Sequence, residues 1–117
     1  MASILNILSI TTIFLALAFQ AYGQTCSLSN IQVSETKTET GYTVRVTNNC
    51  SCMQSKIKFS CVGFKPSQPV DPNLLTQGQD CLLIHGKPLF LAQVITFTYV
   101  SDTRFSFIPK SSEITCH

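Results

Sequence analysis

The sequence contains few of the residues that enzymes use for proton transfer and nucleophilic attack. It has two histidines, His85 and His117, and no Gly-x-Ser-x-Gly elbow, His-Glu-x-x-His helix, phosphate-binding glycine loop or EF-hand loop. Asp71, Asp80 and Asp102 lie beside proline, cysteine or turn residues, where aspartate usually bonds its own backbone. These absences predict no catalytic residue, no metal site and no bound cofactor, so we expect a protein that is not an enzyme.

Charge is also scarce, and its distribution disfavours a nucleic-acid-binding protein. Eight basic and six acidic side chains give a formal net charge of +2. The basic residues are dispersed, whereas nucleic-acid-binding domains gather them into a patch or stripe. The same mild charge, without an amphipathic cationic segment, argues against a protein that permeabilises membranes.

Long apolar runs are absent from the sequence after its first 23 residues. Residues 4–19, ILNILSITTIFLALAF, carry no charge and lead into the small residues Ala21 and Gly23. Signal peptidase requires small side chains before its cut, so we predict a signal peptide over residues 1–23, cleaved before Gln24. The alternative of a membrane anchor is disfavoured, because the run is shorter than the roughly 20 apolar residues of a span and contains polar side chains.

Six cysteines occupy the predicted mature domain, residues 24–117. They are Cys26, Cys50, Cys52, Cys61, Cys81 and Cys116. An even number of cysteines behind an export signal predicts disulfides, because the secretory route is oxidising. Of the 15 possible pairings, three contain a strained bridge between Cys50 and Cys52, which leaves 12 open. The Cys50-x-Cys52 spacing does not fit a zinc site.

Apolar and polar side chains alternate along most of the mature domain, and no segment shows a sustained helical repeat. We expect strands in the segments 31–33, 42–47, 56–61, 82–84, 95–99 and 104–107, the last of them ended by Pro109. Short strands with half-polar faces predict an all-β fold: one small antiparallel β-sandwich of about 6–7 strands, stabilised by disulfides.

One connection, residues 62–80, is too long to be a simple turn. It contains three prolines and the apolar residues Val70, Leu74 and Leu75. Two interpretations remain open for these side chains. They fold back over the end of the sandwich, or an ordered loop offers them to a partner.

Basic residues occupy outward positions of two consecutive expected strands. Arg45 lies on one, and Lys56 and Lys58 lie on the next. If the strands are neighbours, the three side chains share one face and form an electropositive docking patch. The alternative is that the lysines protect a sheet edge against aggregation.

The sequence contains candidate residues both for carbohydrate binding and for glycosylation. A small secreted sandwich can bind a cell-wall glycan through an aromatic platform, and Tyr42 and Tyr99 are the candidates. Asn49-Cys50-Ser51 is formally an N-glycosylation sequon, with Asn49 as the acceptor. A bridge at Cys50 can fold this site away before it is modified.

Several segments together resemble the plant tapetum-determinant-like family of small secreted cysteine-rich proteins. They are YTVRVTNNCSC, IKFSCVGF, DCLLIHGKPL and ITFTYVSDTRFSF, followed by a final cysteine. The likeness runs from Cys26 to Cys116, and its specificity lies in the combination of segments and six cysteines. The tight Cys50-x-Cys52 spacing, and the position of Cys26 directly after the predicted cut, differ from the family's founding ligand and point to a sub-branch.

The resemblance implies a function in recognition. It suggests a ligand secreted into the plant apoplast that binds the ectodomain of a leucine-rich-repeat receptor kinase and acts in cell differentiation and reproductive development. The six cysteines match the six of the family and are expected to form its structural bridges. No family motif marks the receptor contacts. The alternative from a different class is a cell-wall carbohydrate-binding module.

Overall fold

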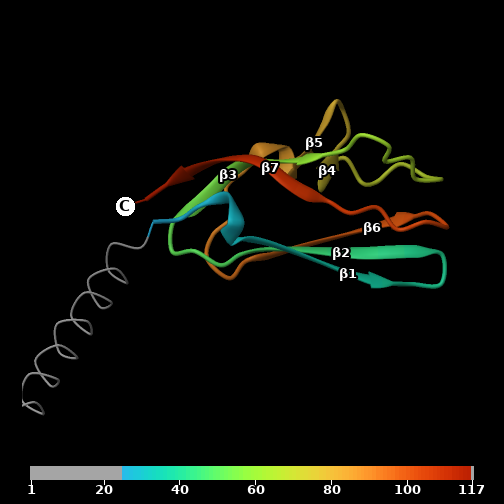
Figure 1. Ribbon diagram of the computed structural model, residues 1–117, viewed down its shortest axis with the longest axis horizontal. Coiled ribbons are helices and arrows are strands. Elements are labelled where there is room, and N and C mark those ends of the chain that lie inside the picture. The colour runs from blue at the N-terminus through green and yellow to red at the C-terminus, as the bar shows by residue number, and fades with distance from the viewer. Residues whose placement is uncertain (1–24, 117) are drawn as a thin grey trace, which may run out of the picture.

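Alternating side chains produce two antiparallel sheets that pack face to face (Figure 1). The computed structural model describes residues 25–116, so the predicted signal peptide and its cut lie outside the described residues. Within this range the structure contains seven strands and two short 3₁₀ helices, η1 (Leu28–Asn30) and η2 (Ile84–Gly86). The predicted all-β sandwich is confirmed. No helix in residues 25–116 is long and apolar enough to cross a membrane.

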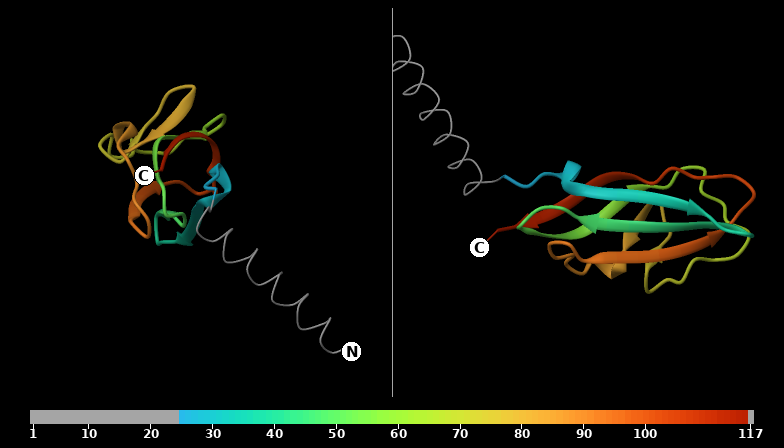
Figure 2. Two further views of the ribbon diagram at one scale, coloured as in Figure 1. Left: turned by 90° about the vertical axis from the view of Figure 1, so that its left-hand side faces the viewer. Right: turned by 90° about the horizontal axis from the view of Figure 1, so that it is seen from below.

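The first sheet contains β1 (Ile31–Lys37), β2 (Gly41–Asn48) and β6 (Val94–Val100), in the order β1-β2-β6. Figure 2 shows these three strands side by side in the view from below. Val44 of β2 lies opposite Phe97 of β6, and both side chains are buried. Gly41 must be glycine, because a Cβ atom there would lie 1.9 Å from the Tyr99 carbonyl oxygen.

The second sheet contains β3 (Met53–Ser60), β4 (Leu75–Thr76), β5 (Asp80–Leu83) and β7 (Ile108–Thr115), in the order β4-β5-β3-β7. The prediction of a strand over residues 104–107 is wrong. Those residues are irregular, and Pro109, expected to end a strand, lies inside β7 opposite Phe59. Because β7 is an edge strand, the missing proline N–H is tolerated there.

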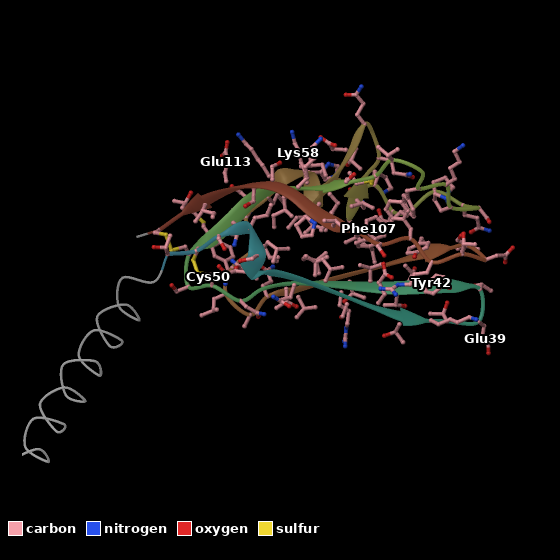
Figure 3. All side chains as sticks on the ribbon, viewed as in Figure 1. Glu39, Tyr42, Cys50, Lys58, Phe107 and Glu113 are labelled. Carbon is pink, nitrogen blue, oxygen red and sulfur yellow. A yellow bond between two sulfur atoms is a disulfide. The ribbon has the colours of Figure 1, made fainter. Side chains whose placement is uncertain are left out.

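An aromatic cluster centred on Phe107 fills the space between the sheets (Figure 3). The Phe107 ring centroid lies 4.9–5.9 Å from those of five rings, all in edge-to-face arrangements. These rings belong to Phe59, Phe64, Phe97, Tyr99 and Phe105. Edge-to-face packing places the positive edge of one ring against the negative face of another, which stabilises the core beyond its buried area.

Strand β3 contains a bulge near its start. Gln54 and Ile57 are both buried although they are three positions apart, and the register with β7 shifts between Ser55 and Lys58. Lys56 adopts a positive φ of 50° within this bulge. After the bulge the expected alternation is present, with Ile57 and Phe59 buried and Lys58 exposed.

All six cysteines are paired, which confirms the predicted disulfides. The pairs are Cys26–Cys50, Cys52–Cys116 and Cys61–Cys81. The first ties the segment before β1 to the turn after β2, the second ties the start of β3 to the end of β7, and the third ties the end of β3 to β5. Two of the three disulfides therefore lie at one end of the molecule, where Figure 3 labels Cys50.

Candidate binding surface

The expected basic patch does not exist as one face. Strands β2 and β3 belong to different sheets, so Arg45 is exposed on the outer face of one layer, and Lys56 and Lys58 are exposed on the outer face of the other. The prediction of a shared face is wrong, because the chain crosses from one sheet to the other over residues 50–52 instead of forming a hairpin. The edge-protection alternative also fails, since β3 is an interior strand of its sheet.

Most charged groups on the second sheet form ion pairs. The Lys56 Nζ lies 3.1 Å from Glu113 Oε1, and the Lys110 Nζ lies 2.9 Å from Asp80 Oδ1. Lys58 and Glu113 project outward from this layer in Figure 3. Such exposed pairs contribute little stability. They neutralise Lys56, one of the two lysines expected to attract a partner, whereas Lys58 forms no ion pair within residues 25–116.

The long connection folds back over the sandwich, as the first of the two interpretations held. Val70 is 6% exposed and Leu75 is 1% exposed, and Leu75 belongs to β4. Their burial corrects the alternative interpretation, in which Val70 and Leu75 contact a partner. Leu74 is half-buried and borders a shallow hollow of about 300 Å³ between the connection and β6.

The two tyrosines that were candidates for a sugar-binding platform pack against each other. The Tyr99 side chain is buried, and the half-buried Tyr42 ring stacks on it with a centroid separation of 5.4 Å. The Tyr99 hydroxyl accepts a hydrogen bond from the Phe105 N–H at 2.8 Å. Burial raises the pKa of Tyr99 above its ordinary value, because the phenolate loses its hydration. Tyr99 is therefore a structural residue.

A buried carboxylate on the edge strand β1 has one cationic partner. The Glu35 side chain is 5% exposed, and one of its oxygens accepts a hydrogen bond from the Arg104 guanidinium. The pKa of Arg104 is raised by this hydrogen bond and by the charge of Glu35. The other oxygen, Oε1, is buried without a hydrogen-bond partner in the described residues. This ion pair ties the irregular segment before β7 to β1.

His85 and the cysteine sulfur atoms, which could in principle act in catalysis or metal binding, are not arranged for either. His85 is exposed, and its Nε2 lies 3.3 Å from the Asn73 side-chain oxygen, an amide that cannot relay a proton. The sulfur atoms of Cys26, Cys52 and Cys116 lie within 4.8 Å of one another. All three are oxidised in disulfides, so they have no thiolate to offer a metal ion.

An exposed apolar tip, on the loop between η2 and β6 and at the first residue of β6, was not predicted from the sequence. We define the tip as Phe90, Leu91 and Val94, which are 56%, 56% and 47% exposed. The signal that marks them is a short, mostly apolar run, LFLAQV, which follows Pro88 and lacks the alternation of the strands. Asn49, the expected glycosylation acceptor, is exposed after β2, and its modification stays a prediction.

Fold and surface together define a class: small, disulfide-stabilised β-sandwich proteins. A family model, Tapetum determinant 1, C-terminal, matches residues 24–117. The chain therefore belongs to the tapetum determinant family, as the sequence resemblance predicted.

One curated relative is TPD1 protein homolog 1 of Arabidopsis thaliana, which is 29% identical over 104 residues. The match covers 80% of this chain and 57% of the relative, so the chain spans little more than half of that relative's length. No solved structure matches.

Proposed function

We propose that this protein is a secreted plant signalling ligand that binds the ectodomain of a leucine-rich-repeat receptor kinase and acts in cell differentiation during reproductive development. The observation that carries the proposal is the family match over residues 24–117, which includes every described strand and all six cysteines. The receptor class comes from the resemblance to a family whose founding ligand binds such a receptor.

The disulfides support secretion into the apoplast. Bridges of this kind form and persist in oxidising compartments, and they are rare in the cytosol. The predicted signal peptide over residues 1–23 supplies the route to that compartment. The disulfides and the predicted signal peptide both favour export, and the apoplastic location is part of the proposal.

A rigid scaffold suits recognition better than turnover. The three disulfides and the buried aromatic cluster hold the strands and loops in place before any partner arrives. A pre-ordered surface loses less conformational entropy on binding than a mobile one. We make no second proposal of a carbohydrate-binding module, because Tyr99 is buried and the half-buried Tyr42 has one ring face stacked on it.

The test is capture of a receptor ectodomain by the secreted protein. The full chain is expressed with its own leader in plant cells, recovered from the medium and applied to immobilised ectodomains of leucine-rich-repeat receptor kinases. We expect saturable binding to at least one ectodomain, with a Kd of roughly micromolar or tighter.

Reduced and alkylated protein is the matched control, and it should not bind. The proposal is overturned if the oxidised protein binds no ectodomain of a family-wide panel. Equal binding by the alkylated protein would also contradict it, because the interaction would then not depend on the folded scaffold.

A further inference from the structure

The tip concentrates apolar exposure within a short segment. Phe90, Leu91 and Val94 are each about half exposed within five consecutive positions. The other large exposed apolar side chains, Val62, Ile108 and Ile114, lie on the segments around the second sheet. A single exposed apolar residue is ordinary, but a cluster on a small protein commonly marks an interaction site.

A buried asparagine holds the start of the tip in place. The Asn48 side chain, at the end of β2, donates hydrogen bonds of 2.9 Å to the carbonyl oxygens of both Leu89 and Cys52 and accepts one from the Cys50 N–H. Leu89 is itself fully buried and exchanges two backbone hydrogen bonds with Gln54, at 2.7 and 3.1 Å. The residue before Phe90 is therefore anchored to both sheets.

The turn that follows is equally restrained. The Ala92 N–H donates to the Asn48 carbonyl oxygen at 2.9 Å, and the Phe90 N–H donates to the Gln93 side-chain oxygen at 3.0 Å. Ala92 has a φ of 63°, a left-handed conformation that is unfavourable for alanine. The surrounding hydrogen bonds maintain a strained backbone, and such strain is concentrated at functional sites.

The charge beside the tip is positive and unopposed. Val94 pairs with Thr47 and Thr96 pairs with Arg45, so Arg45 is a diagonal neighbour of Val94 on the outer face of the first sheet. Arg45 is exposed and forms no ion pair within residues 25–116. Residues 84–100 contain no acidic side chain.

The positive charge beside the tip indicates which kind of partner could bind there. A second copy that bound through the same surface would place one Arg45 near the other, with no carboxylate on either face to relieve the repulsion. An apolar anchor with a guanidinium beside it is instead complementary to a protein that has an apolar pocket next to a carboxylate. Binding hot spots have this composition, a buried aromatic or arginine surrounded by less important contacts.

We propose that Phe90, Leu91, Val94 and Arg45 form the surface that docks into an apolar pocket beside an acidic residue of a partner protein. The inference rests on the proposed function in that it assumes a protein partner. It goes further by assigning the contact surface to one end of the first sheet, in place of the long connection and the lysines of β3.

The test compares surface variants that should all fold. The tip variant carries Phe90→Ala and Leu91→Ala, and a second variant carries Arg45→Glu. The matched controls are Val62→Ala, an apolar residue that is 84% exposed, and Lys58→Glu, a charge reversal on the other sheet. Each protein is checked by thermal unfolding and disulfide mapping and then measured against the receptor ectodomains and against intact plant protoplasts.

We expect the tip variant and Arg45→Glu each to weaken binding by about tenfold or more, the usual loss at a hot spot, and the controls to stay within about twofold. The inference is overturned if wild type binds and either the tip variant or Arg45→Glu binds equally well. It is also overturned if the only tip-dependent binding is self-association of the protein. Protoplast binding that survives protease but is lost after glycosidase treatment would overturn it as well, because the partner would be a glycan. The same holds if wild type binds neither the ectodomains nor the protoplasts.

The protoplast measurement separates this inference from the proposed function. Saturable, protease-sensitive binding to protoplasts that requires the tip, without binding to any receptor ectodomain, would contradict the receptor class and support the surface. If the tip variant binds a receptor ectodomain as tightly as wild type does, the receptor class is supported and the proposed contact surface is contradicted.

Discussion

At the scale of single residues, Tyr99 shows how a core side chain makes stability depend on pH. Its ring packs in the aromatic cluster, and its hydroxyl bonds the backbone of Phe105. Burial raises the pKa of Tyr99, so the folded protein binds this proton more tightly than the unfolded chain does. The stability from this group is complete below the unfolded pKa of about 10 and is lost as the pH rises through the folded pKa.

We predict that Tyr99→Phe removes this alkaline loss. At pH 8 the variant should be less stable by about 1 kcal/mol, because the Phe105 N–H loses its acceptor. Between pH 8 and pH 10.5 the stability of the variant should fall less than that of wild type. Guanidinium unfolding at both pH values measures this, with Tyr42→Phe as the control. An unchanged difference between the two pH values would show that Tyr99 does not titrate on unfolding.

Buried polar residues were the part of the core that the sequence did not reveal. Alternation correctly indicated inward positions such as Val44, Ile57 and Phe97. Asn48 lies directly after the expected strand 42–47, yet it is fully buried, and one of its hydrogen-bond partners, Leu89, lies 41 positions away. A buried asparagine is stable only where distant backbone groups satisfy it, and a single sequence does not show which groups will be near.

At the scale of elements, the bulge in β3 places a lysine in an unfavourable conformation. Lys56 has a positive φ, which glycine adopts readily and other residues adopt at a cost. Its exposed pair with Glu113 offsets little of this cost. The bulge nevertheless keeps both Gln54 and Ile57 on the inner face of the sheet.

We predict opposite effects for glycine at two neighbouring lysines. Lys56→Gly should leave the stability unchanged or raise it by up to about 1 kcal/mol, because the strain is relieved. Lys58→Gly, at a regular strand position, should lower it by roughly 1 kcal/mol. Chemical denaturation of the two variants gives the comparison, and equal destabilisation by both would contradict the role assigned to the bulge.

The strands that were predicted correctly are those with one clearly buried face. Strands β2 and β6 alternate as expected, whereas β7 is largely exposed and gives almost no periodic signal. The segment 104–107 was mistaken for a strand because Phe105 and Phe107 alternate with polar residues. Both rings pack in the aromatic cluster without a backbone ladder. Periodicity reports which side chains turn inward, and it does not report hydrogen-bonded pairing.

At the scale of the whole molecule, the assignment of strands to layers determined which surface residues are neighbours. The spacing of Arg45 and Lys58 in the sequence suggested one patch, but the chain changes sheets between them. Phe90 and Leu91 were missed for a related reason, since an apolar run after a proline gives no indication of whether it is core or surface. The candidate site therefore retains Arg45 from the sequence prediction and depends on the structure for the tip.

We predict that the disulfides at one end of the molecule differ in importance. Cys52–Cys116 closes 64 positions and Cys26–Cys50 closes 24. In the chain-entropy model the double substitutions to alanine should cost about 4 kcal/mol for the first pair and about 3 kcal/mol for the second. Thermal unfolding ranks the two variants. If loss of Cys26–Cys50 proved more damaging, local packing would outweigh restriction of the unfolded chain.

The pairing of these four cysteines has a mechanical consequence. Cys26–Cys50 closes one covalent ring and Cys52–Cys116 closes a second, and Ser51 alone links the two rings. A pull on both ends of residues 26–116 would pass through the two bridges and the backbone around Ser51, so the strands would bear no load. After a single protease cut within either ring, the two fragments stay joined by a disulfide. After a cut beside Ser51, no covalent bond joins the two fragments, and only the packing of the sandwich holds them together.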